Sequence, residues 1–269
     1  MTEIQALILG IVQGLTELLP ISSSAHLKLI PWLFNWDISE EVIESFQIAL
    51  HLGTLLAITI FFFKDWLGLI SGGYKQIVKK EKSTEGRIFW YIVAVTIPAG
   101  ILSLILNSIS DAICEKFGIE MLLIAIALIV LGIALYIVDK KAKSEVKYED
   151  ITFKQSFLIG ISQAIAAAFP GTSRSGITMT VGRALKIDRE SVAKYSFLLS
   201  TPIVLAAVLV DITNFQFNLA FFIGVLSSFI VGLIVIKFLL KFLQKGSFKV
   251  FAIYRLVLGI VIIVTFFIR

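Results

Sequence analysis

The stretch of sequence that decides the fold is Gln13-Gly14-Leu15-Thr16-Glu17-Leu18-Leu19-Pro20-Ile21-Ser22-Ser23-Ser24-Ala25-His26. Apolar residues lie on both sides of it, as in a long membrane helix. Pro20, however, lacks a backbone N–H, and the serines after it favour the start of a new helix. Gln13 and Glu17 are four residues apart and therefore share one face of the first helix. The stretch predicts a helix break that carries polar side chains inside an apolar segment.

The rest of the chain is too apolar for a water-soluble protein. Of its 269 residues, 58% are hydrophobic and 16% are charged, whereas soluble domains carry about 25% charged residues. Six apolar stretches approach or exceed the ~17–25 residues that a spanning helix needs: residues 46–63, 88–110, 121–138, 195–210, 212–236 and 250–268. We therefore predict an all-α integral membrane protein with six transmembrane helices. No soluble domain with a basic patch is present, which argues against nucleic-acid binding.

The distribution of lysine and arginine predicts the orientation of these helices. Basic residues concentrate in 64–87, 140–154 and 237–249, which the positive-inside rule places in the cytoplasm. Residues 35–45 contain four acids and no Lys or Arg, so we place them outside. Because 140–154 and 183–194 both belong inside, the apolar stretch between them must enter and leave on the same side. We predict a re-entrant helix-loop-helix segment there, and a second one at 4–34, broken at Pro20.

The two re-entrant stretches are related by a separation of 150 residues. Gly10-Ile11-Val12-Gln13 aligns with Gly160-Ile161-Ser162-Gln163, and at the same offset Pro20 aligns with Pro170 and Ser23 with Ser173. Three predicted spans follow each break, and the first break dips from outside while the second dips from inside. We therefore predict a single membrane domain, 1–269, built from two inverted-topology repeats: about 1–138 and about 155–269, joined by a cytoplasmic connection at about 139–154. In such folds the two broken helices form one binding site between them.

The second break is suited to binding an anion. It reads Pro170-Gly171-Thr172-Ser173-Arg174-Ser175-Gly176-Ile177-Thr178. The glycines allow the backbone to approach a ligand closely, and a helix N-terminus favours negative charge. Arg174 adds a permanent cation with a planar fork of donors, which matches phosphate.

A charge at bilayer depth costs at least ~2.5–3.5 kcal/mol, so we expect Glu17, His26 and Arg174 to face one another or a water-filled cavity. Three structural alternatives stay open: a Glu17–Arg174 ion pair, a packing role for His26, and simple helix capping by the serines. Lys28 and Arg255 are expected to extend to the nearest membrane surface. For His51 the sequence leaves two interpretations open, an interfacial position or a place in the site.

Both breaks resemble the signature motifs of the undecaprenyl-diphosphate phosphatase family, also called the bacitracin-resistance phosphatases. The first motif, Glu-or-Gln-x-x-x-Glu followed by Pro-x-Ser-Ser and a His, corresponds to residues 13–26. The second, Pro-Gly-x-Ser-Arg-Ser-x-x-Thr, corresponds to residues 170–178, and residues 251–255 resemble the family's last helix. Gln13 stands where many members have an acid, and Ala25 where a Gly is common. The resemblance covers essentially the whole chain.

The resemblance implies a cell-membrane enzyme that removes the terminal phosphate of a polyprenyl diphosphate, with an active site that opens toward the outer face and requires Mg²⁺ or Ca²⁺. It implies that Ser23 is the nucleophile, that Glu17 positions it or binds the metal, and that His26 is a general acid or base. Arg174 would hold the phosphates. The remaining implied substrate-binding residues are Gln13, Ser22, Ser24, Thr172, Ser173 and Thr178. The implied partners are the lipid substrate and the bilayer, and we also consider a homodimer.

A transporter or flippase of a lipid-linked phosphate is the main alternative, since broken helices in inverted repeats are also a transporter design. A non-catalytic phospholipid-binding scaffold is a third class. The group of Ser23, Glu17 and His26 favours the enzyme, because a carrier or scaffold needs no acid–base pair.

Overall fold

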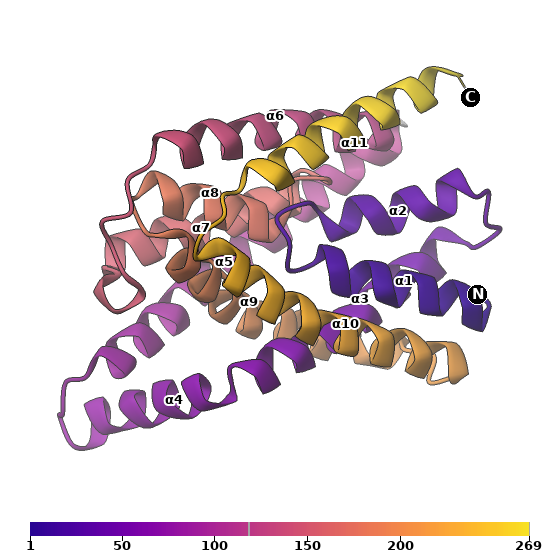
Figure 1. Cartoon of the computed structure of the whole chain (residues 1–269). Coiled ribbons are helices and arrows are strands. Elements are labelled where there is room, and N and C mark those ends of the chain that lie inside the picture. The colour runs from indigo at the N-terminus through magenta and orange to yellow at the C-terminus, as the bar shows by residue number, and fades with distance from the viewer. Residues whose placement is uncertain (118, 269) are drawn as a thin grey trace.

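The computed structural model describes residues 1–117 and 119–268, and in these ranges it contains helices and loops without a strand (Figure 1). Six helices are long and apolar enough to cross a membrane, which confirms the predicted number. They are α3 (Glu40–Phe61), α5 (Thr84–Phe117), α6 (Glu120–Lys141), α9 (Arg189–Asp211), α10 (Leu219–Leu243) and α11 (Lys249–Ile268).

One span begins later than predicted. The apolar run 212–236 starts with a short 3₁₀ turn, η2 (Ile212–Asn214), and α10 begins only at Leu219. The reason is local capping: the Asn218 side chain accepts a hydrogen bond from the backbone N–H of Phe221 at 2.9 Å. An asparagine in an apolar run therefore ends the loop and starts the helix.

Two pairs of shorter helices contain the predicted breaks. The first pair is α1 (Glu3–Thr16) and α2 (Ser23–Leu33), and the second is α7 (Phe153–Ala168) and α8 (Arg174–Ala184). Both α1 and α7 begin with a capping box, formed by Thr2 with Gln5 and by Thr152 with Gln155. Helices of 14, 11, 16 and 11 residues are about 16–24 Å long at 1.5 Å per residue. None of them alone spans a hydrocarbon core of about 30 Å.

The two breaks share an unusual backbone. Ser22 and Ser173, the N-caps of α2 and α8, have φ angles of 75° and 69°, a region that residues other than glycine rarely occupy. Each serine hydroxyl accepts a hydrogen bond from the backbone N–H three residues later. These local bonds stabilise a sharp turn directly before each helix.

The constant offset of 150 residues does not continue through the breaks. α7 has 16 residues and α1 has 14, while the turn at 169–173 is one residue shorter than the turn at 17–22. After the break the separation is therefore 151 residues. The predicted alignment of Ser23 with Ser173 was wrong: Ser22 corresponds to Ser173, and Ser23 corresponds to Arg174.

The first short helix of each half packs against a long helix of the other half. α1 lies along α10, α7 lies along α5, and α6 and α11 lie side by side. The α1–α10 contact depends on small residues: a Cβ on Gly10 would lie 2.5 Å from the Gly224 carbonyl oxygen, and one on Gly14 would lie 2.8 Å from that of Ser228. Such close packing is typical of membrane helices, and it places both turns inside the molecule.

The basic region 64–87, predicted as a cytoplasmic connection, contains a further helix. This is α4 (Phe63–Val78), which forms a hairpin with α5 at the lower left of Figure 1. The connection between α6 and α7 contains only the 3₁₀ turn η1 (Tyr148–Asp150).

Candidate active site

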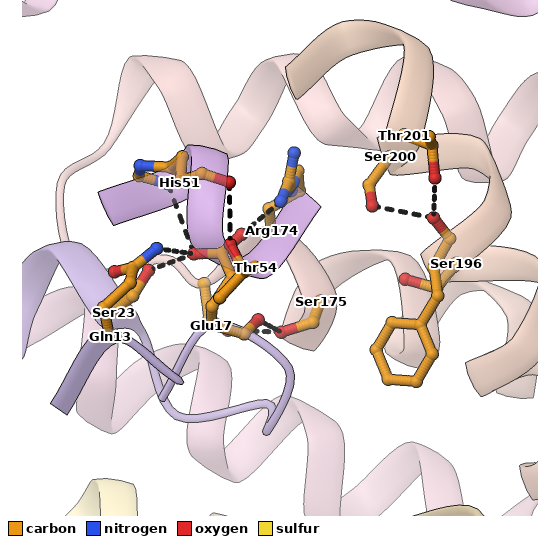
Figure 2. Close-up of polar contacts among 12 residues, drawn as sticks. Gln13, Glu17, Ser23, His51, Thr54, Arg174, Ser175, Ser196, Ser200 and Thr201 are labelled. Carbon is orange, nitrogen blue, oxygen red and sulfur yellow. Dashed lines mark hydrogen bonds and ion pairs between the residues drawn. The ribbon is translucent and has the colours of Figure 1, made fainter. Parts of the chain in front are cut away.

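The centre of the site is the carboxylate of Glu17, a buried residue that directly follows α1 (Figure 2). Ser23 donates its hydroxyl hydrogen to Glu17 Oε2 at 2.6 Å, and Gln13 Nε2 donates to the same oxygen at 3.2 Å. Arg174 Nη2 pairs with the other oxygen, Oε1. The structure therefore brings together four of the predicted site residues: Gln13 and Glu17 from before the first break, Ser23 from after it, and Arg174 from the second break.

The local backbone explains why these side chains meet. Gln13 and Glu17 are one turn apart on the same face of α1. Ser23 is the first residue of α2 and Arg174 is the first residue of α8, and both follow a serine N-cap with positive φ. Because the two breaks have the same geometry, equivalent residues of the two turns reach the same carboxylate.

His51 of α3 completes the group around Glu17 (Figure 2). Its Nε2 lies 3.3 Å from Glu17 Oε2, and its Nδ1 lies 2.7 Å from the Gln47 carbonyl oxygen. Since a carbonyl oxygen only accepts, Nδ1 carries a hydrogen and Nε2 is the nitrogen that faces the site. Thr54 donates to the His51 carbonyl at 3.1 Å. Of the two open interpretations of His51, the structure supports the place in the site.

His26 faces a different neighbour. Its Nδ1 donates to the Ser22 carbonyl at 2.6 Å, and its Nε2 lies 2.7 Å from the hydroxyl of Tyr254 in α11. The two rings stack at 5.6 Å between centroids. The hydrogen bonds of His26 in the described structure reach neither Ser23 nor Glu17. His26 is thus close to Ser23 in sequence but is held by the last helix.

Ser175, which the sequence did not single out, joins the two breaks. Its hydroxyl donates to the carbonyl oxygens of Leu19 at 3.0 Å and Glu17 at 3.2 Å, both in the first turn. Since these carbonyls follow the end of α1, they lack helical partners. Ser175 therefore fixes the second turn on the first. The sequence feature that could have identified Ser175 is its hydroxyl in the second motif, directly after Arg174.

The other predicted hydroxyls lie around this centre. Ser22 and Ser24 contact each other at 3.3 Å, and Ser173 contacts Ser175 at the same distance. Thr178 donates to backbone carbonyls of α8 and contacts Ser196 of α9 at 2.6 Å. These contacts stabilise the turns and their helices.

Arg255 does not extend to the membrane surface, so that expectation was wrong. It is fully buried and donates to five backbone carbonyls, those of Pro20, Ala127, Leu128, Gly171 and Thr172, at 2.9–3.4 Å. Three of these carbonyls belong to the two breaks, where regular helical hydrogen bonding stops. A buried guanidinium supplies the missing donors, so Arg255 attaches both turns to α6 and α11.

A second buried ionic group lies apart from Glu17. Asp139, at the end of α6, accepts hydrogen bonds from Arg183 Nε at 2.9 Å, Arg189 Nε at 2.8 Å and the backbone N–H of Phe248 at 3.1 Å. Arg183 also donates to carbonyls of the connection after α6. This group joins the ends of α6, α8, α9 and α11. Lys28, expected at the surface, is partly exposed and pairs with Glu120.

The residues around Glu17 fit a divalent cation that arrives with a phosphate ligand. Among the described residues, no group of three or more His, Cys, Asp or Glu side chains could hold a metal by itself. Mg²⁺, however, commonly binds one or two carboxylates together with substrate phosphates. Gln13 Oε1 is buried and has no hydrogen-bond partner in the described part of the chain. Its amide is bonded to Glu17, so the two side chains offer oxygen ligands next to each other.

Fold and site together define a class: a polytopic α-helical membrane protein in which two helix breaks join a hydroxyl, a carboxylate and a guanidinium in its interior. The chain belongs to the family of the bacitracin resistance protein BacA, whose family model matches residues 6–261. This finding confirms the family that the two motifs predict.

Relatives in this family are similar along their whole length. Proteins named undecaprenyl-diphosphatase are 48% identical in Pelotomaculum thermopropionicum, 44% in Caldicellulosiruptor bescii and 40% in Moorella thermoacetica. The first alignment covers 98% of this chain and 97% of the relative, the second 100% and 99%, and the third 100% of both.

Proposed function

We propose that this protein is an undecaprenyl-diphosphate phosphatase, which hydrolyses a polyprenyl diphosphate to the monophosphate and inorganic phosphate and so recycles the carrier lipid. The observation that carries the proposal is the 2.6 Å hydrogen bond from Ser23 to Glu17, with Arg174 on the second carboxylate oxygen. A hydroxyl, a proton acceptor and a phosphate-binding cation are the groups that phosphoryl transfer from a diphosphate needs.

In the proposed reaction, the terminal phosphate lies at the first turns of α2 and α8. The N-termini of these helices and the guanidinium of Arg174 offset its negative charge. Ser23 Oγ attacks the terminal phosphorus while Glu17 takes the hydroxyl proton. The bond from phosphorus to the bridging oxygen breaks, and the polyprenyl monophosphate leaves with the proton that Glu17 took up, so that Glu17 is again a carboxylate. Water, deprotonated by Glu17, then hydrolyses the phosphoserine and regenerates Ser23.

Arg174 can bind phosphate without leaving Glu17. A guanidinium has five N–H donors in a rigid fork, and only Nη2 pairs with Glu17. The side chain of Arg174 is 21% exposed, against 6% for Glu17, so the guanidinium is the more accessible of the two groups. We propose that it bridges the carboxylate and the terminal phosphate.

We propose that Mg²⁺ or Ca²⁺ binds at Glu17 and Gln13 Oε1 together with the diphosphate. When bound, such a cation supplies positive charge to the phosphate oxygens. His26 remains the proposed general acid or base. Because Nδ1 donates to Ser22, the nitrogen that can exchange a proton is Nε2, and Tyr254 is its present partner.

We further propose that the two halves are inverted repeats with re-entrant helix pairs, and that the site opens toward the outer face. The matching capping boxes and N-caps support the repeat. The reciprocal packing of α1 on α10 and of α7 on α5 supports a pseudo-twofold relation between the halves. In this arrangement the polyprenyl tail stays in hydrocarbon while the diphosphate enters between the breaks.

The test is phosphate release from a C15 or C55 polyprenyl diphosphate by the protein purified in detergent with Mg²⁺. Glu17→Ala, Arg174→Ala and Ser23→Ala should each lose nearly all turnover. Ser108→Ala is the matched control, because Ser108 is exposed on α5 and donates only to its own helix.

Thermal unfolding of each variant in detergent shows whether it is folded. An inactive parent protein would support the transport alternative instead, and full activity of Glu17→Ala and Arg174→Ala would refute the mechanism. If Ser23→Ala alone keeps activity, a water molecule replaces the serine as nucleophile.

A further inference from the structure

The helix α4 exposes a continuous apolar face. Its six outward residues recur at the spacing of one helix face and are each 53–63% exposed. This apolar stripe consists of Phe63, Leu67, Ile70, Tyr74, Ile77 and Val78. An apolar stripe of this length would be unfavourable in contact with water, so the question is what environment covers it.

The opposite face of α4 is packed, which fixes the direction of the stripe. Leu69 is buried, and two glycines allow α5 to approach closely. A Cβ on Gly72 would lie 2.6 Å from the backbone nitrogen of Gly86, and one on Gly73 would lie 2.3 Å from the Phe89 ring. The helix therefore cannot rotate to bury the stripe against α5.

Two polar contacts fix the level of α4 relative to the membrane. Asp65 in its first turn pairs at 2.5 Å with Lys194, near the start of α9. Arg87, in the first turn of α5, donates to the carbonyl of Glu149 in the connection between α6 and α7. Both partners belong to segments that the positive-inside rule places in the cytoplasm. α4 is therefore held at the cytoplasmic ends of the spanning helices.

Basic residues border the stripe. Lys64 and Lys75 lie on one side of it by helical spacing, and Lys79, Lys80 and Lys82 follow in the loop. Residues 63–83 contain five lysines and two acids, of which Asp65 is paired with Lys194. The surface next to the stripe is thus strongly positive, and the inner leaflet of a cell membrane is rich in anionic lipids.

We propose that α4 is an interfacial helix. Its apolar stripe lies at the boundary between headgroups and acyl chains of the cytoplasmic leaflet, and its lysines bind anionic phospholipid headgroups. The proposal is independent of the reaction at Glu17. Because α5 also packs along α7, lipid binding at α4 supports the helix that leads to the second break.

The depth of the stripe can be measured in the whole protein. A nitroxide is attached at Leu67→Cys in a Cys114→Ser background, and the protein is placed in nanodiscs of phosphatidylcholine and phosphatidylglycerol. We expect more collisions with oxygen than with a water-soluble nickel chelate at residue 67, and the reverse for a control label at residue 82. Predominant access of the nickel chelate at residue 67, or spin–spin broadening from a second copy, would overturn the proposal.

The headgroup preference needs a separate comparison. Lys79→Gln/Lys80→Gln/Lys82→Gln is compared with the matched triple variant Lys237→Gln/Lys241→Gln/Lys245→Gln, whose lysines are exposed at the cytoplasmic end of α10. We expect phosphatidylglycerol to raise the Tm of the parent and of the α10 variant, and the α4 variant to lose at least half of this shift. No shift in the parent, or an equal loss in both variants, contradicts specific binding at α4.

Discussion

Replacing Arg255 by methionine tests whether one buried guanidinium holds the two helix breaks together. Methionine keeps an unbranched stem of similar size but removes every donor. Since the charge is removed together with the donors, the variant leaves no unpaired ion in the interior. The loss falls on the carbonyl oxygens of Pro20, Gly171 and Thr172, which belong to the breaks.

The size of the effect follows from the distances. A buried acceptor that loses its partner costs about 1–3 kcal/mol. The contacts to Pro20 and Gly171 are 3.4 Å long, so each belongs at the low end, about 1 kcal/mol. Thr172, at 2.9 Å, contributes about 2 kcal/mol. Arg255→Met should therefore lower the free energy of unfolding by about 4 kcal/mol. Arg255→Lys keeps the charge but not the planar fork of donors, so its free energy of unfolding should lie between those of the parent and of Arg255→Met.

Thermal unfolding in detergent measures this loss, with Lys249→Met as the control, because Lys249 is exposed on the same helix. At about 2–4 °C per kcal/mol for a chain of this size, the Tm should fall by roughly 8–16 °C. Phosphate release should fall more than tenfold, since loosened turns no longer align Ser23 with Arg174. If Arg255→Met unfolds like Lys249→Met, the guanidinium is not a structural link, and the surface position expected from the sequence was the better account.

Three further substitutions follow from the site. His51→Leu should lower kcat more than tenfold because Glu17 loses a fixed neighbour. His51→Gln keeps a donor and should retain much of the parent kcat; steady-state kinetics of phosphate release measure both values. Ser175→Ala should lower the free energy of unfolding by about 1–2 kcal/mol in thermal unfolding, because the Glu17 carbonyl loses the Ser175 donor and the Leu19 carbonyl keeps only the backbone N–H of Ile21. Asp139→Ala should cost about 3–5 kcal/mol, since Arg183 is left buried and unpaired; an unchanged Tm would show that water compensates the charge.

The spanning helices were predictable because hydrophobicity is a property of the local sequence. The breaks were predictable for the same reason, since proline and capping serines act within a few residues. α4 was not predicted. Its 16 residues are shorter than a span, and the lysines of 64–87 suggested a connection. The apolar run 212–236 begins earlier than α10, because a single capping residue, Asn218, has little weight in an apolar run.

At the site, the high cost of a charge in the membrane predicted that Glu17, His26 and Arg174 face one another or a water-filled cavity, and the structure pairs Glu17 with Arg174. The partners of Arg255, His26 and His51 could not be predicted, because they depend on packing between helices far apart in sequence. Arg255 could have been predicted to be buried if the carbonyls left unpaired at two breaks had been counted as acceptors. Tyr254, the partner of His26, carries no such signal in the sequence.

The shift from 150 to 151 residues explains how the two breaks supply different groups to the candidate site. With a constant offset, Ser23 and Ser173 would be equivalent, and the two halves would present two hydroxyls. With the observed shift, Ser23 and Arg174 are equivalent, so the same position supplies a hydroxyl from one half and a cation from the other. The carboxylate comes from one half only, because Ala167 stands 150 residues after Glu17. Gln163, which aligns with Gln13, is buried and has no hydrogen-bond partner in the described chain. A second, symmetric site would need an acid beside it, so the divergence of the two halves concentrates the acid, the hydroxyl and the cation around Glu17.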